Sequence, residues 1–377
     1  MNPARLKAIV RKEFYHLIRD YRSLYLAFAI PLLLIILFGY ALSLDVDHIK
    51  TIVADYDKTP QSREFVEKLD ASPYFDIIAR IDSSRQVADF LDTEMASVAI
   101  IIPPGFMKNI KANRAAQIQV IIDGSDPVFA GAVRGYMTGF TEAYNSRLLA
   151  AFLNRQGLDP ICAPVDGRVR VWFNEDLESR NFIIPGMIAI IIMIVGALLT
   201  ALVIAREYEA GTMETIKSLP VCAGELLLGK AIPYFFITLA NVLIAMLLGQ
   251  ILFGITLKGS FWLMLAGTSL YLVCALSLGL LISTVAKSQL LANQAAVMIT
   301  YLPSLLLSDF VFPIINMPVL LQWFTYLVPA RYYIDILAGV YLRNTGLSYL
   351  GPAMAVLGGM SLLLMALNYI LLKKEGL

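Results

Sequence analysis

Residues 24–44 read LYLAFAIPLLLIILFGYALSL, a run of 21 residues without Asp, Glu, Lys or Arg. A helix needs about 20 mainly apolar residues to cross a bilayer. The whole chain of 377 residues shares this character, because 58% of it is apolar, 16% is charged and the mean hydropathy is +0.69. Soluble proteins have about 45–50% apolar and about 25% charged residues. The composition therefore predicts an α-helical polytopic membrane protein and argues against a soluble enzyme.

Five further runs of similar length predict six transmembrane helices in all. Between the last two runs, residues 313–349 are apolar but are interrupted by Pro318, Pro329 and charged side chains. This segment is too broken to span, so we expect a re-entrant segment of short helices folded back at the membrane surface. The expected spans are residues 24–44, 182–204, 231–257, 261–285, 290–312 and 350–372.

Residues 1–23 are strongly basic, with six Lys and Arg against Glu13 and Asp20. The positive-inside rule places this end in the cytoplasm, and six spans return the carboxyl terminus there. Apolar residues at helical spacing predict an interfacial amphipathic helix with its apolar face in the headgroups and its cations toward anionic lipid. An unstructured basic leader is the alternative. Cleavage after residues 41–43 is disfavoured, because the apolar run and the region before it are long for a signal peptide.

Residues 45–180 separate the first two spans and have a different character. Four apolar runs, 49–54, 75–81, 97–102 and 117–122, alternate with helical segments, which predicts an α/β domain. The topology puts this domain outside the cytoplasm, and its 20 acidic and 15 basic residues give a net charge of −5. Residues 123–127, Asp-Gly-Ser-Asp-Pro, are expected to form a turn at a strand end.

The chain lacks the usual signatures of catalysis and metal binding. It has two histidines and three scattered cysteines, and the formal net charge of +1 argues against nucleic acid as a partner. Residues 224–230 formally match the start of a P-loop, but Ala231 stands where Ser or Thr would hold magnesium. We therefore expect no catalytic residue, no metal site and no bound cofactor in this chain.

Residues 205–230 form the longest expected cytoplasmic loop, whose periodicity fits a short helix or a solvated loop equally well. Its segment EYEAGTME, residues 207–214, is followed by Pro220. This segment resembles the E-x-x-x-G-T-x-E signature of ABC-2 type transporter permeases. The span order and the segments before the last span are also similar to this family, with its type V exporter-like architecture.

Motifs of the external region resemble the bacterial multidrug-exporter branch of the family. These are Asp55-Tyr56-Asp57 with Ser62-Arg63, residues 72–75, Ile102-Pro103 and residues 123–125. One departure is Ser308-Asp309-Phe310, where that branch usually has Ser-Gly-Phe. The resemblance covers nearly the whole chain.

The resemblance implies the permease subunit of an ATP-driven exporter in the bacterial inner membrane, moving drug-like or amphipathic compounds outward. A second permease subunit, identical or a paralogue, would complete the pore. Two cytoplasmic ATP-binding subunits would supply ATP and magnesium, and a periplasmic adaptor is a further possible partner. The implied coupling residues are Glu207, Glu209, Gly211, Thr212 and Glu214.

Polar residues inside spans are costly and suggest a substrate pathway or gate. Asn293 and Gln294 open the fifth span, Ser304 lies within it and Asp309 lies near its outer end. Hydrogen bonds between helices are the structural alternative for the first three. Asp309 would either attract cationic substrates or pair with Arg331.

Two other classes of function remain open from the residues alone. A membrane receptor could use the external domain as a sensor, although such proteins usually carry a cytoplasmic signalling domain. An ion-coupled secondary transporter would not need the loop at residues 205–230.

Overall fold

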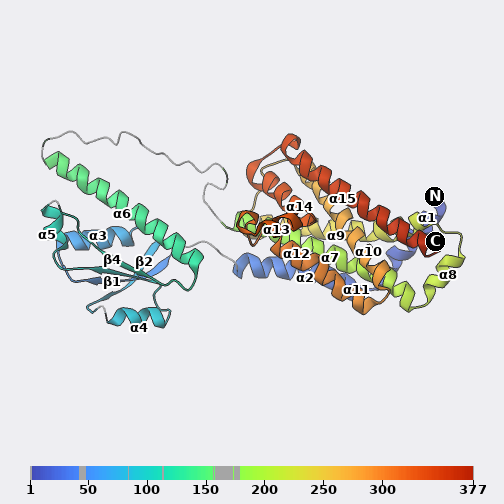
Figure 1. Ribbon diagram of the computed structural model, residues 1–377, viewed down its shortest axis with the longest axis horizontal. Coiled ribbons are helices and arrows are strands. Elements are labelled where there is room, and N and C mark those ends of the chain that lie inside the picture. Colours follow the sequence, from blue (N-terminus) through green and yellow to red (C-terminus); the bar gives the residue numbers. More distant parts are fainter. Residues whose placement is uncertain are drawn as a thin grey trace. The chain divides into compact units, whose positions relative to one another are not determined.

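The computed structural model describes residues 2–41, 48–83, 85–112, 114–155, 157, 173 and 179–376. The chain divides into two compact units, residues 44–170 and residues 1–43 with 171–377. Figure 1 shows a mixed α/β unit and a helical unit, which are described separately below. Most of residues 156–178 lie outside the described residues, as do residues 42–47, which include the expected end of the first span and the expected start of the external domain.

The α/β unit is built on one four-stranded sheet with the order β2-β1-β3-β4. Strand β1 pairs in parallel with β2 and β3, and β4 runs antiparallel to β3. Each strand begins and ends within two residues of the expected apolar run, so the predicted strands are confirmed. The strands are β1 (Ile49–Asp55), β2 (Phe75–Ile81), β3 (Val98–Ile102) and β4 (Gln119–Ile122).

Helices cover both faces of this sheet, which explains why its strands are nearly continuously apolar. Ile49 and Val53 of β1 pack with α3, α5 and α6 on one face, whereas Ile52 and Ala54 pack with α4 on the other. Figure 1 shows α3 and α6 on one side of the sheet and α4 on the opposite side. The helices are α3 (Pro60–Asp70), α4 (Gln86–Asp92), α5 (Phe106–Lys111) and α6 (Pro127–Arg155).

The carboxylates of Asp55, the last residue of β1, and Asp57 hold the loops at this edge of the sheet together. Asp55 accepts the Ser62 hydroxyl (2.7 Å) and the Lys58 backbone N–H (3.0 Å). The Asp57 carboxylate accepts the backbone N–H groups of Gly105 (2.7 Å), Phe106 (3.1 Å) and Met107 (2.9 Å) at the start of α5. Burial raises the pKa of Asp57, but the hydrogen bonds from Thr59 and these three N–H groups outweigh it and hold the pKa below its usual value. The Asp-Tyr-Asp motif is therefore structural in this position.

The helical unit contains four helices that are long and apolar enough to cross a membrane. Helix α2 also contains a shorter apolar helical stretch, Phe28–Tyr40, and α11 to α12 follow one another across a π-helical turn, η1. The four long helices are α7 (Arg180–Glu209), α9 (Ala223–Phe253), α10 (Phe261–Ala286) and α15 (Leu347–Lys374). The others are α1 (Pro3–Arg19), α2 (Tyr21–Ala41), α8 (Thr212–Ser218), α11 (Gln289–Ala296), η1 (Val297–Tyr301) and α12 (Leu302–Leu306).

Short helices fill the segment between α12 and α15, as the sequence predicts. It contains a 3₁₀-helical turn, η2 (Ile314–Asn316), and a π-helical turn, η3 (Gly339–Arg343). Its two α-helices are α13 (Val319–Thr325) and α14 (Pro329–Ala338). Pro318 directly precedes α13 and Pro329 is the first residue of α14, where a missing backbone N–H costs no helical hydrogen bond.

Helix α7 is the packing centre of the unit and contacts α2, α9, α10, α11 and α14. Its closest neighbour is α10, because Gly279 lets the two backbones meet: a Cβ there would lie 2.1 Å from Thr200 Oγ1 and 2.3 Å from the Ala197 carbonyl oxygen. Thr200 donates to the Leu276 carbonyl oxygen (3.1 Å), and Ser283 accepts the N–H of Ala205 (2.8 Å). Small residues and hydrogen bonds of this kind are how helices associate within a membrane.

Candidate functional site

The segment between α7 and α9 is shorter than the expected loop at residues 205–230. Helix α7 continues to Glu209 and α9 begins at Ala223, so only residues 210–222, which include α8, lie between them. Lys230, the last residue of the expected loop, lies inside α9 and is buried, with 2% of its surface exposed. The P-loop-like residues 224–230 are helical, so they do not form a phosphate-binding loop.

Lys230 is held by two carboxylates from different helices. Its Nζ lies 2.9 Å from Glu13 Oε1 on α1 and 2.9 Å from Glu207 Oε1 on α7, and all three side chains are less than 15% exposed. We call Glu13, Glu207 and Lys230 the buried charge cluster. Lys12 lies at its rim, 3.2 Å from Glu207 and 59% exposed. A buried ion is tolerated only when it is paired, so the cluster fixes α1, α7 and α9 against one another.

Glu207 also connects this cluster to the start of α8. The Thr212 hydroxyl donates to the Glu207 carboxylate, and Met213 is buried, with 2% exposure. Gly211 lies between the two helices at φ +69°, and a Cβ there would have no atom within 4 Å. The left-handed backbone conformation at this turn accounts for a glycine at position 211.

Glu209 joins the same region to α11. Its carboxylate accepts the backbone N–H of Gln289 (2.7 Å) and the side-chain Nε2–H of Gln289 (2.5 Å). Since Gln289 is the first residue of α11, Glu209 satisfies one of the free N–H groups at that helix end. The carboxylates of Glu207 and Glu209 therefore bind other residues of this same chain.

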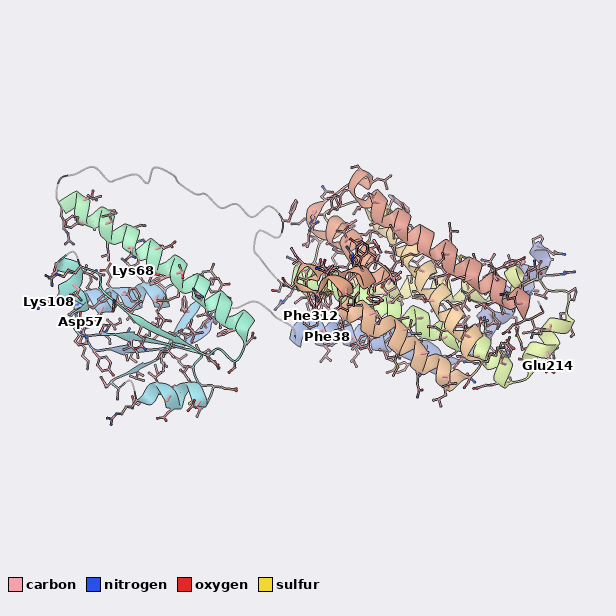
Figure 2. All side chains as sticks on the ribbon, viewed as in Figure 1. Phe38, Asp57, Lys68, Lys108, Glu214 and Phe312 are labelled. Atoms are coloured by element: carbon pink, nitrogen blue, oxygen red, sulfur yellow. The ribbon has the colours of Figure 1, made fainter. Side chains whose placement is uncertain are left out.

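Glu214 differs from the other signature carboxylates because its side chain is exposed. Within the described part of the chain it has no hydrogen bond or ion pair. Its neighbours Thr215, Ser218 and Leu219 are also exposed, Leu219 to 51%. We call Glu214, Thr215, Ser218 and Leu219 the α8 face. Figure 2 labels Glu214 at the end of the unit where Figure 1 shows the chain's two ends, while Phe38 and Phe312 lie at the opposite end.

The amphipathic helix α1 is present, but its apolar stripe is oriented differently from the expectation. Glu13 and Leu17 are buried, and a Cβ at Gly229 of α9 would lie 2.5 Å from Ile9 Cγ2. This part of the stripe therefore packs on α9. Phe14 and Ile18, on another side, are 45% and 50% exposed. The physical reason is the charge pairing of Glu13 with Lys230, which draws its face of α1 onto the bundle.

The residues expected to meet substrate lie in two different environments. Asn293 and Gln294 are exposed on α11, whereas Ser304 of α12 is 1% exposed and its Oγ has no hydrogen-bond partner among the described residues. Asp309 lies at φ +70° and accepts the N–H of Ile314 (2.8 Å). The alternative pairing with Arg331 is not seen.

Arg331 has other partners. Its guanidinium lies over the Tyr326 ring, 4.0 Å from the centroid, and donates to the Thr325 hydroxyl.

Three residues of this region were missed by the sequence interpretation: Glu13, Lys230 and Gln289. The first two carried a usable signal. Glu13 interrupts the apolar stripe formed by Ile9 and Leu17, and Lys230 stands next to an apolar run with no acid in its own helix turn. A charge on an apolar helix face predicts a buried partner of opposite charge. Gln289 gave no such signal.

The geometry and the apolar helices define the class of this protein, a multi-pass helical membrane protein with an α/β unit. The chain belongs to the ABC-2 family of transporter proteins, whose family model matches residues 22–370. It is 37% identical over 343 residues to the probable multidrug ABC transporter permease YbhS of Escherichia coli, covering 90% of this chain and 89% of that protein. The probable multidrug permease YbhR of Escherichia coli is 28% identical over 345 residues, 91% of each chain.

A third relative is the inner membrane transport permease YhhJ of Escherichia coli, 25% identical over 303 residues, which are 80% of this chain and 78% of that protein. The resemblance to ABC-2 permeases is confirmed. Membership in this family implies association with ATP-binding subunits and the pairing of permeases. The relatives and the apolar helices together support a multi-pass protein of the inner membrane.

Proposed function

We propose that this chain is the permease subunit of an ATP-driven exporter that moves amphipathic, drug-like compounds outward across the inner membrane. The printed names of its relatives, probable multidrug permeases, support the substrate class. ATP and magnesium belong to separate ATP-binding subunits in this proposal, and a periplasmic adaptor is a further partner.

The proposed topology has six spans, with both termini in the cytoplasm and the α/β unit outside it. The four long apolar helices supply spans two, three, four and six, α2 supplies the first and α11 to α12 the fifth. The basic side chains of α1 and the Lys373 and Lys374 pair at the end of α15 lie beside apolar helices, which favours the cytoplasmic side for both.

The observation that carries the proposal is the contrast within residues 207–214. Glu207 of α7 is bonded to Lys230 of α9 and to Thr212 of α8, and Glu209 of α7 is bonded to Gln289 of α11. The α8 face, in contrast, is exposed and has an unpaired carboxylate within the described structure. A short helix that is exposed on one side and anchored to several long helices is suited to receive force from a soluble partner. We propose that Glu214 contacts a basic or amide group of the ATP-binding subunit.

The pore in this proposal needs a second permease subunit. The exposed side of α11 and α12 supports this, because Met298, Ile299 and Leu302 are 66%, 52% and 46% exposed next to the amides Asn293 and Gln294. An apolar surface with a few polar groups suits an amphipathic compound. We place the substrate pathway along this surface, with Ser304 and Asp309 toward its outer end.

Glu214→Lys tests the coupling role. We expect the purified variant to stimulate its ATP-binding subunit at least about tenfold less than the wild type, because a reversed charge at a charged contact costs about 1.4 kcal/mol or more. The measurement is ATP hydrolysis by the reconstituted complex. Glu142→Lys, an exposed reversal on α6, is the matched control and should stimulate normally.

The thermal unfolding midpoint of Glu214→Lys should equal that of the wild type, since the side chain is exposed and makes no hydrogen bond or ion pair among the described residues. Normal stimulation by Glu214→Lys would refute the coupling role. If no ATP-binding subunit co-purifies reproducibly with the wild type, an ion-coupled secondary transporter or a receptor becomes the better reading.

A further inference from the structure

A cavity of about 520 Å³ lies beside α1, on a side that does not contact α9. Lys12, Tyr15, His16 and Arg19 follow the helical spacing i, i+3, i+4 and i+7, so they share one face of the helix. The residues packed toward α9, such as Glu13 and Leu17, occupy a different face. The cavity is lined by Lys12, Tyr15, His16, Arg19 and Asp20.

The charges around this cavity leave one cation without a counter-ion. Lys12 is paired with Glu207, and Asp20 lies 3.7 Å from the Arg206 guanidinium. Arg19 has no carboxylate within ion-pair distance in the described part of the chain. Arg11 adds positive charge nearby, with its guanidinium 5.6 Å from the centre of the Tyr15 ring.

The cavity lies where the apolar segments of three helices end. Helix α2 begins at Tyr21, immediately after the lining residue Asp20, and becomes charge-free after Arg22. Arg206 of α7 forms an ion pair with the lining residue Asp20. Lys230 of α9 and the lining residue Lys12 both pair with Glu207. Charged residues that line up at the ends of apolar helices mark the level of the lipid headgroups.

Exposed apolar side chains lie next to the cationic face on the same helix. Phe14 and Ile18 are 45% and 50% exposed, and Tyr15 is 51% exposed. They offer apolar contact surface directly beside the cations Lys12 and Arg19. A soluble anion would need only the cations, whereas a lipid accounts for both features.

We propose that this cavity binds the headgroup of an anionic phospholipid of the cytoplasmic leaflet. The phosphodiester is held by Arg19 and Lys12, and its acyl chains run along Phe14 and Ile18. A lipid in this position closes the outer side of α1, whose inner side is fixed by the buried charge cluster. The proposal rests on the membrane placement of α2 in the proposed function, but not on coupling to an ATPase.

Binding of fluorescent phosphatidylglycerol to the full chain in a neutral detergent tests this, with phosphatidylcholine as the comparison and no ATP-binding subunit present. The wild type should bind phosphatidylglycerol more tightly. Arg19→Gln should weaken that binding about fivefold, the effect of one basic group near anionic lipid. Arg19→Lys should retain most of it. Lys7→Gln removes a charge from an exposed position of α1 outside the cavity and should have little effect.

Three results would overturn the proposal. Equal affinity for the two lipids would show that no anionic headgroup is selected. An equal loss in Arg19→Gln and Lys7→Gln would show a diffuse attraction to the whole helix. Displacement of the lipid by millimolar glycerol phosphate would show a site for free phosphate. Because ATP hydrolysis is not measured, none of these results bears on the coupling role of Glu214.

Discussion

The buried charge cluster and the α8 face are both reached by the same signature segment, yet they are opposite in character. Glu207 is paired with Lys230 and almost enclosed, whereas Glu214, seven residues further along the chain, is exposed. A shared signature therefore does not mean a shared role. One part of the segment holds the permease helices together, and the other part is left free for a partner.

The largest expected effect comes from removing the cation of the buried charge cluster. Lys230→Met leaves Glu13 and Glu207 buried without their partner, so we expect a loss of about 3–5 kcal/mol of stability. The thermal unfolding midpoint in detergent measures this. Lys217→Met, which removes a cation from partly exposed α8, should change the midpoint far less.

A triple variant separates charge from packing in that cluster. Lys230→Met with Glu13→Gln and Glu207→Gln removes all three charges and should recover much of the midpoint, because no unpaired ion remains. If Lys230→Met alone unfolds the protein no more than Lys217→Met does, the cluster does not hold the three helices together.

A smaller effect is expected at the turn between the two regions. Gly211→Ala places a side chain at φ +69°, which costs about 1–2 kcal/mol for an L-residue. Gly346→Ala is the matched control, because that glycine has φ −86° and equally open space around its Cα. Similar thermal midpoints for the two variants would mean that Gly211 is not required by its backbone conformation.

The smallest effect on stability should come from Glu209→Gln. The variant loses the negative charge that faces Gln289, but its side chain is exposed and water replaces the contact. We expect a lower midpoint than the wild type but a higher one than Gly211→Ala. A drop as large as that of Lys230→Met would show that Glu209 belongs with the buried charge cluster.

The sequence predicted the α/β unit well because both faces of its sheet are buried. Strands such as Ile49–Asp55 are then nearly continuous apolar runs, and polar helical segments separate them. The order of the strands and the antiparallel β4 did not follow from the runs, because pairing depends on contacts distant in sequence.

The candidate site was predicted by position but not by role. The signature located Glu207 and Gly211, but a single sequence does not show that Glu13, more than 190 residues away, neutralises Lys230 beside Glu207. That Lys230 lies inside α9, and not in the preceding loop, was missed for the same reason. A lysine usually marks the end of an apolar run, unless another helix supplies its counter-ion.

The π-helical turn η1 determines which side of α12, the helix that follows it, faces the rest of the unit. It lies directly before Leu302 and Pro303, and it amounts to one extra residue in an α-helix. If residues 297–301 took the regular α-helical period with no residue removed, α12 would rotate by about 100° relative to α11. Ser304, which is buried, would then turn away from the side on which α12 meets α7 and α14. The inserted residue thus decides which side chains of this helix face the interior.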